Sequence, residues 1–241
     1  MTKPLHRILV IFGLFLIINF TANAKSELSF KQNLVIEADG INHLFSDVGS
    51  GSLYIHGADV DEISVEATIR SKKYSNIEEL EEAFNEKMVL ILEDNGSKAT
   101  LKSMTKNKIF NNNINISIDL NVTVPFELDL QVDDGSGSMK ITDMKGNLDI
   151  DDGSGSLVIK NIVGDILIDD GSGSQTLSNI DGSVIVDDGS GSVNMKNVSG
   201  DVTIDDGSGS INIEGLSGQF KLIDDGSGSI YVNGKKWINK D

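Results

Sequence analysis

The sequence contains no cysteine, two prolines and one tryptophan among its 241 residues. The absence of cysteine excludes disulfide bonds, thiolate metal ligands and a lipid anchor on an N-terminal cysteine. Apolar burial and backbone hydrogen bonds must therefore hold the chain together. Its length is sufficient for a sizeable core.

Basic residues are scarce as well. Twenty lysines and arginines stand against 37 aspartates and glutamates, and the formal net charge is −17. Nucleic-acid-binding proteins usually present basic surfaces, so this balance argues against a nucleic-acid partner. It also argues against unassisted binding to anionic lipid headgroups. It fits a self-repelling exported protein, or a protein that gathers cations.

Only one stretch is long and apolar, and it lies near the N-terminus. A basic start precedes the apolar run 8–20, and Ala22-Asn23-Ala24 then has the small-x-small form of a cleavage site. These features predict a signal peptide over 1–24. An uncleaved anchor is the alternative, although the run is shorter than the roughly 20 residues of a membrane span. We therefore expect export to the periplasm, the cell surface or the medium, without membrane insertion of the mature chain.

The six-residue stretch Asp-Asp-Gly-Ser-Gly-Ser is repeated along the second half of the chain. Its six copies begin at Asp133, Asp151, Asp169, Asp187, Asp205 and Asp224, at spacings of 18, 18, 18, 18 and 19 residues. Each unit contains two halves that open Gly-polar-apolar-x-apolar, and this alternation predicts two short strands with one buried face each. The fold class predicted is therefore all-β: a single-stacked, parallel β-helix-like β-solenoid with 18 residues and two strands per turn.

The two corners of each predicted turn differ. The Asp-Asp-Gly-Ser-Gly corner is tight, whereas the second corner carries an apolar plug, at Met144, Ile162, Ile180, Val198 and Leu216. Residue types that tolerate positive φ precede the plugs, at Asp143, Asn161, Asn179, Asn197 and Gly215. Ile223 is the additional residue behind the spacing of 19, and we interpret it as a β-bulge.

Less regular segments flank this array. The predicted organisation is an N-terminal β-rich region over 25–127, followed by a repeat array with a C-terminal cap over 128–241. Region 25–127 contains one helix, 75–87, with Ser75 as its N-cap and Glu78 completing a capping box. We expect this helix to pack over the end or side of a sheet, and Trp237 to occupy the last plug position as a lid.

The chain resembles a known family at this level of organisation. Val122-Thr123-Val124-Pro125, followed by strand residues and glycine-punctuated Gly-Ser-apolar-x-apolar repeats, is similar to the exported bacterial "putative adhesin" domain with β-strand repeats. The resemblance covers about residues 34–232. It implies a β-solenoid in a cell-envelope setting and no catalytic residues. The uniform Asp-Asp of every turn departs from the family pattern.

Stacking of the turns would align the aspartates into two columns. Like charges about 5 Å apart repel, so turn hydrogen bonds and water, or a cation, must offset the repulsion. The first interpretation is turn chemistry, in which the second Asp accepts from N–H groups just after it and the first points to solvent. The alternative is a Ca²⁺ ladder, because calcium binds six to eight oxygens. Its candidate ligands are Asp134, Asp152, Asp170, Asp188, Asp206 and Asp225; no other cofactor is expected.

Catalysis has little support in the sequence. Beyond the predicted signal peptide there are two histidines, His43 and His56, both outside the array, and serine has no activating residue at a repeated offset. A carbohydrate-active enzyme that uses the Asp pairs is a remote alternative. We therefore expect no enzyme but an adhesin-like scaffold that binds an unidentified surface molecule or protein. Leu167 and Ile185, on adjacent turns, form the candidate contact patch.

Overall fold

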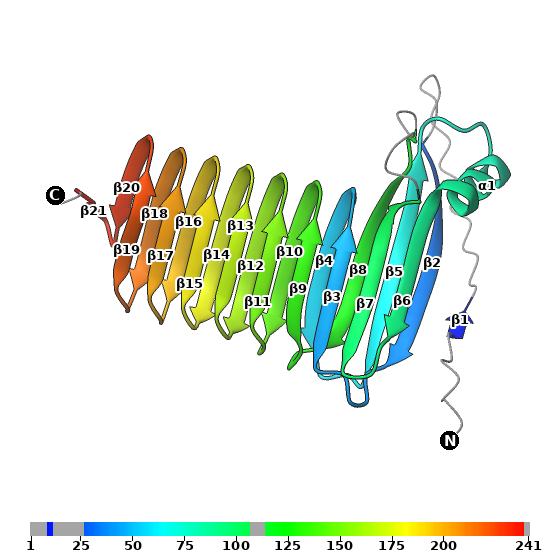
Figure 1. Cartoon of the computed structure of the whole chain (residues 1–241), viewed down its shortest axis with the longest axis horizontal. Helices are drawn as coiled ribbons and strands as arrows, with labels where there is room; N and C mark the ends of the chain where they lie inside the picture. Colours follow the sequence, from blue (N-terminus) through cyan, green and yellow to red (C-terminus); the bar gives the residue numbers. More distant parts are fainter. Residues whose placement is uncertain (1–8, 12–26, 107–113, 239–241) are drawn as a thin grey trace.

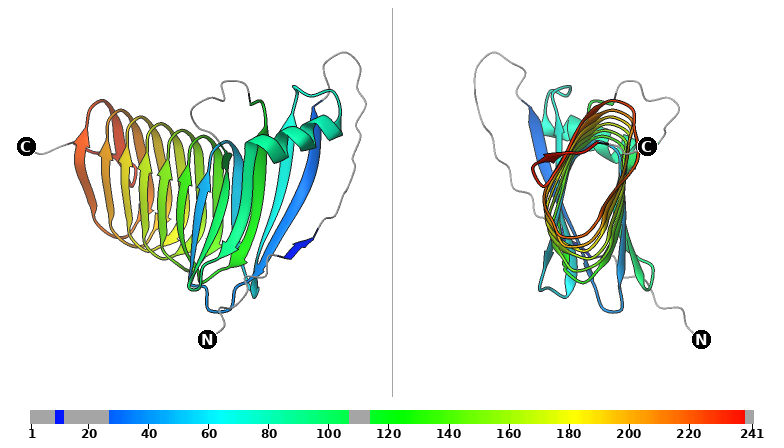
Figure 2. Two further views of the ribbon diagram at one scale, coloured as in Figure 1. Left: turned by 45° about the vertical axis from the view of Figure 1, so that its right-hand side comes forward. Right: turned by 90° about the vertical axis from the view of Figure 1, so that its left-hand side faces the viewer.

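The computed structural model of the chain describes residues 9–11, 27–106 and 114–238. The predicted signal peptide 1–24 lies outside the described residues, except for β1 (Leu9–Ile11), which pairs antiparallel with β2 (Leu28–Glu37). Two sheets of 12 and nine strands face each other and form a flattened tube (Figures 1 and 2). No helix in the described part of the chain is long and apolar enough to cross a membrane.

The repeat array supplies its strands alternately to the two sheets. The 12-stranded sheet receives β10 (Gly137–Met144), β12 (Gly155–Val163), β14 (Gly173–Asp181), β16 (Gly191–Val198), β18 (Gly209–Leu216) and β20 (Gly228–Val232). The nine-stranded sheet receives β9 (Asp129–Asp134), β11 (Leu148–Asp152), β13 (Ile166–Asp170), β15 (Val184–Asp188), β17 (Val202–Asp206) and β19 (Phe220–Asp225). Each strand pairs in parallel with its equivalent one turn on, as Ile141 does with Ile159. The predicted β-solenoid, with 18 residues and two strands per turn, is confirmed.

The N-terminal region continues the same two sheets. Its strands are β3 (His43–Val48), β4 (Gly51–Ala58), β5 (Glu62–Ser71), β6 (Met88–Asp94), β7 (Lys98–Thr105) and β8 (Ser117–Pro125). The stretch Asp47-Val48-Gly49-Ser50-Gly51-Ser52 resembles the repeated motif and belongs to a further full turn, because β4 pairs in register with β10 and β3 with β9. Strand β8 lies between β4 and β5, and β6 and β7 form an antiparallel hairpin. Both sheets thus run without interruption across the domain boundary predicted at 127/128.

The one helix of the described residues, α1 (Ile77–Lys87), lies at the N-terminal end of the tube and contacts β2 of the 12-stranded sheet and β6, the outermost strand of the nine-stranded sheet. Phe84 packs edge-on against Phe30 of β2, with ring centroids 5.6 Å apart. The predicted packing over a sheet end is confirmed. The predicted N-cap is wrong by one residue: the Asn76 side chain accepts from Glu79 N, because Asn76 has the extended backbone that a cap requires.

Most inward positions of the turns form apolar columns, and these columns make up the core. All five predicted corner plugs are buried, from Met144 to Leu216. The residues before them have positive φ as expected: Asp143 64°, Asn161 57°, Asn179 58°, Asn197 58° and Gly215 70°. The plug corner therefore repeats one left-handed residue in every turn.

The tight corner depends on glycine for a steric reason. A Cβ atom placed on Gly155, whose φ is +147°, would lie 1.7 Å from the carbonyl oxygen of Gly137 in the preceding turn. Backbones of successive turns are stacked in direct contact there, so no side chain fits.

The C-terminal end is closed differently from the prediction. Ile223 lies in a β-bulge as expected, where the pairing of β17 with β19 shifts register. Trp237, however, does not occupy the plug position: the chain reverses at Asn233-Gly234, and β21 (Lys235–Lys236) pairs antiparallel with β20. Asn-Gly favours such a two-residue turn. Trp237 packs edge-on against Phe220 across the end of the tube, with centroids 4.9 Å apart.

Candidate functional site

The aspartates of the tight corners form two columns with opposite environments. In-register pairing places Asp152 beside Asp134 and beside Asp170, one strand spacing away on either side. We call the second aspartates the inward column: Asp134, Asp152, Asp170, Asp188 and Asp206. We call the first aspartates the outward column: Asp133, Asp151, Asp169, Asp187 and Asp205. The outward column is exposed or half-buried, whereas Asp134 is 2% exposed and the other inward aspartates are 1% exposed.

Turn hydrogen bonds satisfy one oxygen of most inward carboxyls. The backbone N–H two residues on donates to Oδ1 of Asp134, Asp152, Asp170 and Asp188 at 3.0–3.2 Å. This confirms the predicted turn chemistry. The other oxygen, Oδ2, is buried without a hydrogen-bond partner in Asp134, Asp152 and Asp188, and Asp206 has no partner for either oxygen. The inward carboxyls are 1–2% exposed, which differs from our expectation of carboxyls open to solvent.

Burial changes the acid–base behaviour of the inward column. Desolvation, followed by repulsion from neighbouring aspartates, raises the pKa of Asp134, Asp152 and Asp188 from 3.8 to about 6. Burial also raises the pKa of Asp170 and of Asp206. A carboxyl is costly to ionise when it lacks both water and a cation.

One turn provides its aspartate with a side-chain partner. Gln175, the polar residue at an otherwise apolar inward position of the array, is fully buried, and its Nε2 donates to Asp170 Oδ2 at 3.1 Å. Asp170 is thus the best-satisfied member of the inward column. The polar Gln175 at this otherwise apolar position is therefore explained by the buried carboxylate of Asp170 beside it.

The inward column offers few ligands to a calcium ion. The first inward residues after the tight corners are Met139, Leu157, Gln175, Val193 and Ile211, of which only Gln175 has a side-chain oxygen. The sixth candidate ligand, Asp225, is half-buried at the C-terminal end. Among the described residues, no group of three or more acidic, histidine or cysteine side chains has the arrangement of a metal site. The Ca²⁺ ladder stays a prediction.

The plug corner carries a second ladder, built from side-chain amides. Asn161 Nδ2 donates to Asp143 Oδ1 at 2.8 Å, and Asn179 and Asn197 each donate to the residue one turn before at 2.9 Å. The Asn161 hydrogen bond is the main reason that the pKa of Asp143 is lowered. The residue types at these positions indicate the positive φ, whereas the ladder depends on the in-register stacking of the turns.

A groove lies on the nine-stranded sheet beside the plug corner. It has a volume of about 380 Å³, and its lining includes the exposed apolar pair Leu167 and Ile185, which are 46% and 50% exposed. Asp129, Asp149 and Asp165 also line it, whereas no lysine or arginine does. The contact patch predicted from Leu167 and Ile185 is thus part of an apolar groove with an acidic border.

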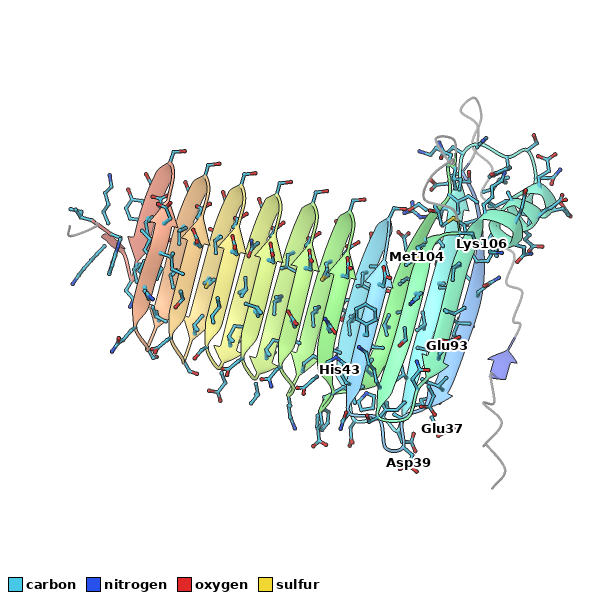
Figure 3. The ribbon with its side chains drawn as sticks, viewed as in Figure 1. Glu37, Asp39, His43, Glu93, Met104 and Lys106 are labelled. Atoms are coloured by element: carbon cyan, nitrogen blue, oxygen red, sulfur yellow. The ribbon has the colours of Figure 1, made fainter. Side chains whose placement is uncertain are left out.

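The histidines lie closer to the array than predicted. His43, labelled in Figure 3, lines the groove, and His56 Nδ1 lies 3.1 Å from Thr142 Oγ1 and 3.2 Å from Asp143 Oδ2. This follows from the pairing of β4 with β10. A catalytic triad needs one ring nitrogen for the orienting carboxylate and the other for the nucleophile. Here both contacts use the same nitrogen, so the cluster does not have the geometry of a triad.

Comparison with known proteins finds similar structures but no related sequences. No protein-family model matches the chain, and neither does any curated protein. A putative cell adhesion protein from Clostridium sporogenes is 11% identical, with a TM-score of 0.40 over 81% of this chain and 99% of its own. A putative adhesin from Bacteroides fragilis is 11% identical, with a TM-score of 0.44 over 86% and 97%.

A third similar structure has another name: a putative lipid binding protein from Parabacteroides distasonis, 16% identical, with a TM-score of 0.31 over 83% of this chain and 95% of its own. The first two names agree with the resemblance noted in the sequence. At such identities and TM-scores they assign no function to this chain.

Proposed function

We propose that this chain is an exported, non-catalytic scaffold of the cell envelope that binds another surface molecule. The observation that carries the proposal is the groove with its apolar pair, Leu167 and Ile185, on a sheet face of the solenoid. The stacked turns of the solenoid themselves form this groove. The basic start and apolar run within 1–24 support export.

The lining of the groove specifies the chemistry of the partner. Leu167 and Ile185 favour an aliphatic group, and Asp129, Asp149 and Asp165 favour positive charge beside it. We therefore expect a polypeptide segment in which aliphatic and basic residues alternate. A purely cationic polymer would be attracted by the net charge of −17 without needing the groove.

Two probe peptides separate these possibilities. A Leu-Lys alternating peptide and a Ser-Lys peptide of equal length and charge are titrated into the protein at physiological salt. The proposal predicts tighter binding of the Leu-Lys peptide, and predicts that Leu167→Asp/Ile185→Asp removes the preference. Thr176→Asp/Asn194→Asp, an exposed pair on adjacent strands of the other sheet, is the matched control and should retain it. Equal binding of both peptides by the unaltered protein would refute the assignment of the groove.

Export is tested separately, by fractionating cells that express the full chain and sequencing the mature N-terminus. A soluble form beginning at Lys25 in the periplasm or medium supports the proposal; cleavage there would also remove β1 from the edge of β2. Retention of the intact chain in the cytoplasm would contradict it.

A further inference from the structure

We propose that the inward column is a proton-binding site, in which neighbouring carboxyls share protons and so stabilise the stacked turns in mildly acidic media. The ligand is the proton, and the site spans five successive turns. The inference concerns the interior of the solenoid and is independent of the groove. Several carboxyl oxygens of the inward column are buried without a hydrogen-bond partner.

Buried polar atoms normally have hydrogen-bond partners, so orphaned ones require an explanation. In Asp134, Asp152 and Asp188 the unpaired atom is Oδ2, and in each the partner of Oδ1 is a backbone N–H. The orphaned atoms therefore recur at the same place on both sides of Asp170, whose own Oδ2 accepts from Gln175. A protonated carboxyl supplies what is missing, since its O–H is a donor and its neighbour in the column is an acceptor.

The surroundings of the column contain negative charge only. Inward-column neighbours repel Asp134, Asp152 and Asp188, the outward aspartates add repulsion along the whole column, and Asp225 repels Asp206. At the N-terminal end the equivalent position on β3 is Val48, which is paired with Asp134. The strands that follow the corners contribute Met139, Leu157, Gln175, Val193 and Ile211, none of which titrates.

Because none of these neighbouring side chains is basic, buried like charges one strand spacing apart, about 4.8 Å, are unfavourable, and proton uptake relieves the repulsion.

Gln175 indicates how protons are distributed along the column. Because its amide donates to Asp170, that carboxyl has the best reason to stay ionised. Asp152 and Asp188 flank Asp170, and repulsion from Asp170 contributes to raising the pKa of each to about 6. On this basis Asp170 stays ionised between two protonated neighbours, Asp152 and Asp188.

The test compares melting temperatures (Tm) of the whole chain at pH 5.0 and pH 7.5. The variant Asp152→Asn/Asp188→Asn places neutral amides in the inward column. The matched control Asp151→Asn/Asp187→Asn removes the same charge from the same strands of the outward column. We expect the Tm of the unaltered protein to be lower at pH 7.5 than at pH 5.0. The inward variant should raise the Tm at pH 7.5 by roughly 5 °C or more and shrink the pH difference, whereas the control should do neither.

A bound metal ion is the alternative that the same experiment excludes or establishes. At pH 7.5 the melts are repeated in EDTA and in millimolar CaCl₂. Equal Tm values in the two support the proton site. A Tm that rises with calcium in the unaltered protein, and does not rise in the inward variant, overturns it in favour of a Ca²⁺ ladder.

Two further results would overturn the proposal: a Tm of the unaltered protein that does not fall between pH 5.0 and 7.5, or equal effects of inward and outward variants. If the double variant does not fold, the single variants Asp152→Asn and Asp151→Asn are compared in the same way, since each removes one charge from one column.

Discussion

At the scale of single residues, the alternation of side chains along a strand decides whether each aspartate is buried or exposed. Asp152 lies two positions after Ile150, so strand alternation directs both side chains inward, whereas Asp151 between them faces solvent. The sequence contained this signal, and applying the alternation rule past the last apolar residue would have found the buried carboxyls. The number of orphaned oxygens could not be predicted, because it depends on how closely the facing strand packs.

The tight-corner glycines have a specific steric role. Gly173→Ala places a Cβ 1.9 Å from the carbonyl oxygen of Gly155 at a φ of +154°. We expect a loss of at least roughly 4 kcal/mol in the free energy of unfolding, because neither stacked backbone can move aside. Urea denaturation measures it. Ser174→Ala, at the exposed neighbouring position, serves as the control and should change stability by less than about 0.5 kcal/mol.

The asparagine ladder combines a backbone and a side-chain contribution. Asn179→Ala loses hydrogen bonds to Asn161 and from Asn197 and retains a strained φ of 58°. Asn179→Gly loses the same hydrogen bonds without the strain. We expect the alanine variant to lose roughly 2–3 kcal/mol and the glycine variant about 1 kcal/mol less than that. Equal losses in chemical denaturation would mean that the left-handed backbone is not strained there.

At the scale of elements, local signals predicted the strands, and long-range pairing decided their order. The 18-residue period alone predicted parallel, in-register pairing, and the array strands obey it except where the bulge shifts β19 against β17. No local pattern predicted that β8 lies between β4 and β5, because both of these strands are far from β8 in the sequence. The Asn233-Gly234 turn was a readable signal, and it explains the position of Trp237.

The helix cap gives an element-scale prediction. Asn76→Ala should lower the free energy of unfolding by about 1 kcal/mol, because Asn76 Oδ1 accepts from Glu79 N at 2.9 Å. Ser75→Ala is the matched control and should have almost no effect, since only its backbone N–H is used, in a 3.1 Å hydrogen bond to Glu79 Oε2. If thermal melts show a larger loss of stability for Ser75→Ala than for Asn76→Ala, Ser75 is the N-cap, as expected from the sequence.

At the scale of the whole molecule, the stack concentrates charge as well as apolar surface. Five carboxyls are buried in one line within a chain of net charge −17. A pKa raised from 3.8 to about 6 corresponds to roughly 3 kcal/mol for an isolated carboxyl. Because the folded state binds these protons more tightly than the unfolded chain, their stabilisation is complete below about pH 4 and is lost as the pH rises through about 6.

The most direct measurement of this account is a site-resolved ¹³C NMR titration of the aspartate carboxyl carbons in the folded, unaltered protein. If the inward column binds protons, Asp134, Asp152 and Asp188 titrate with midpoints near 6, and the transitions of neighbours are coupled to one another. Midpoints at or below about 4 for all three, the ordinary range for aspartate, would contradict it. The inward column would then have to be ionised inside the solenoid and neutralised by a bound cation.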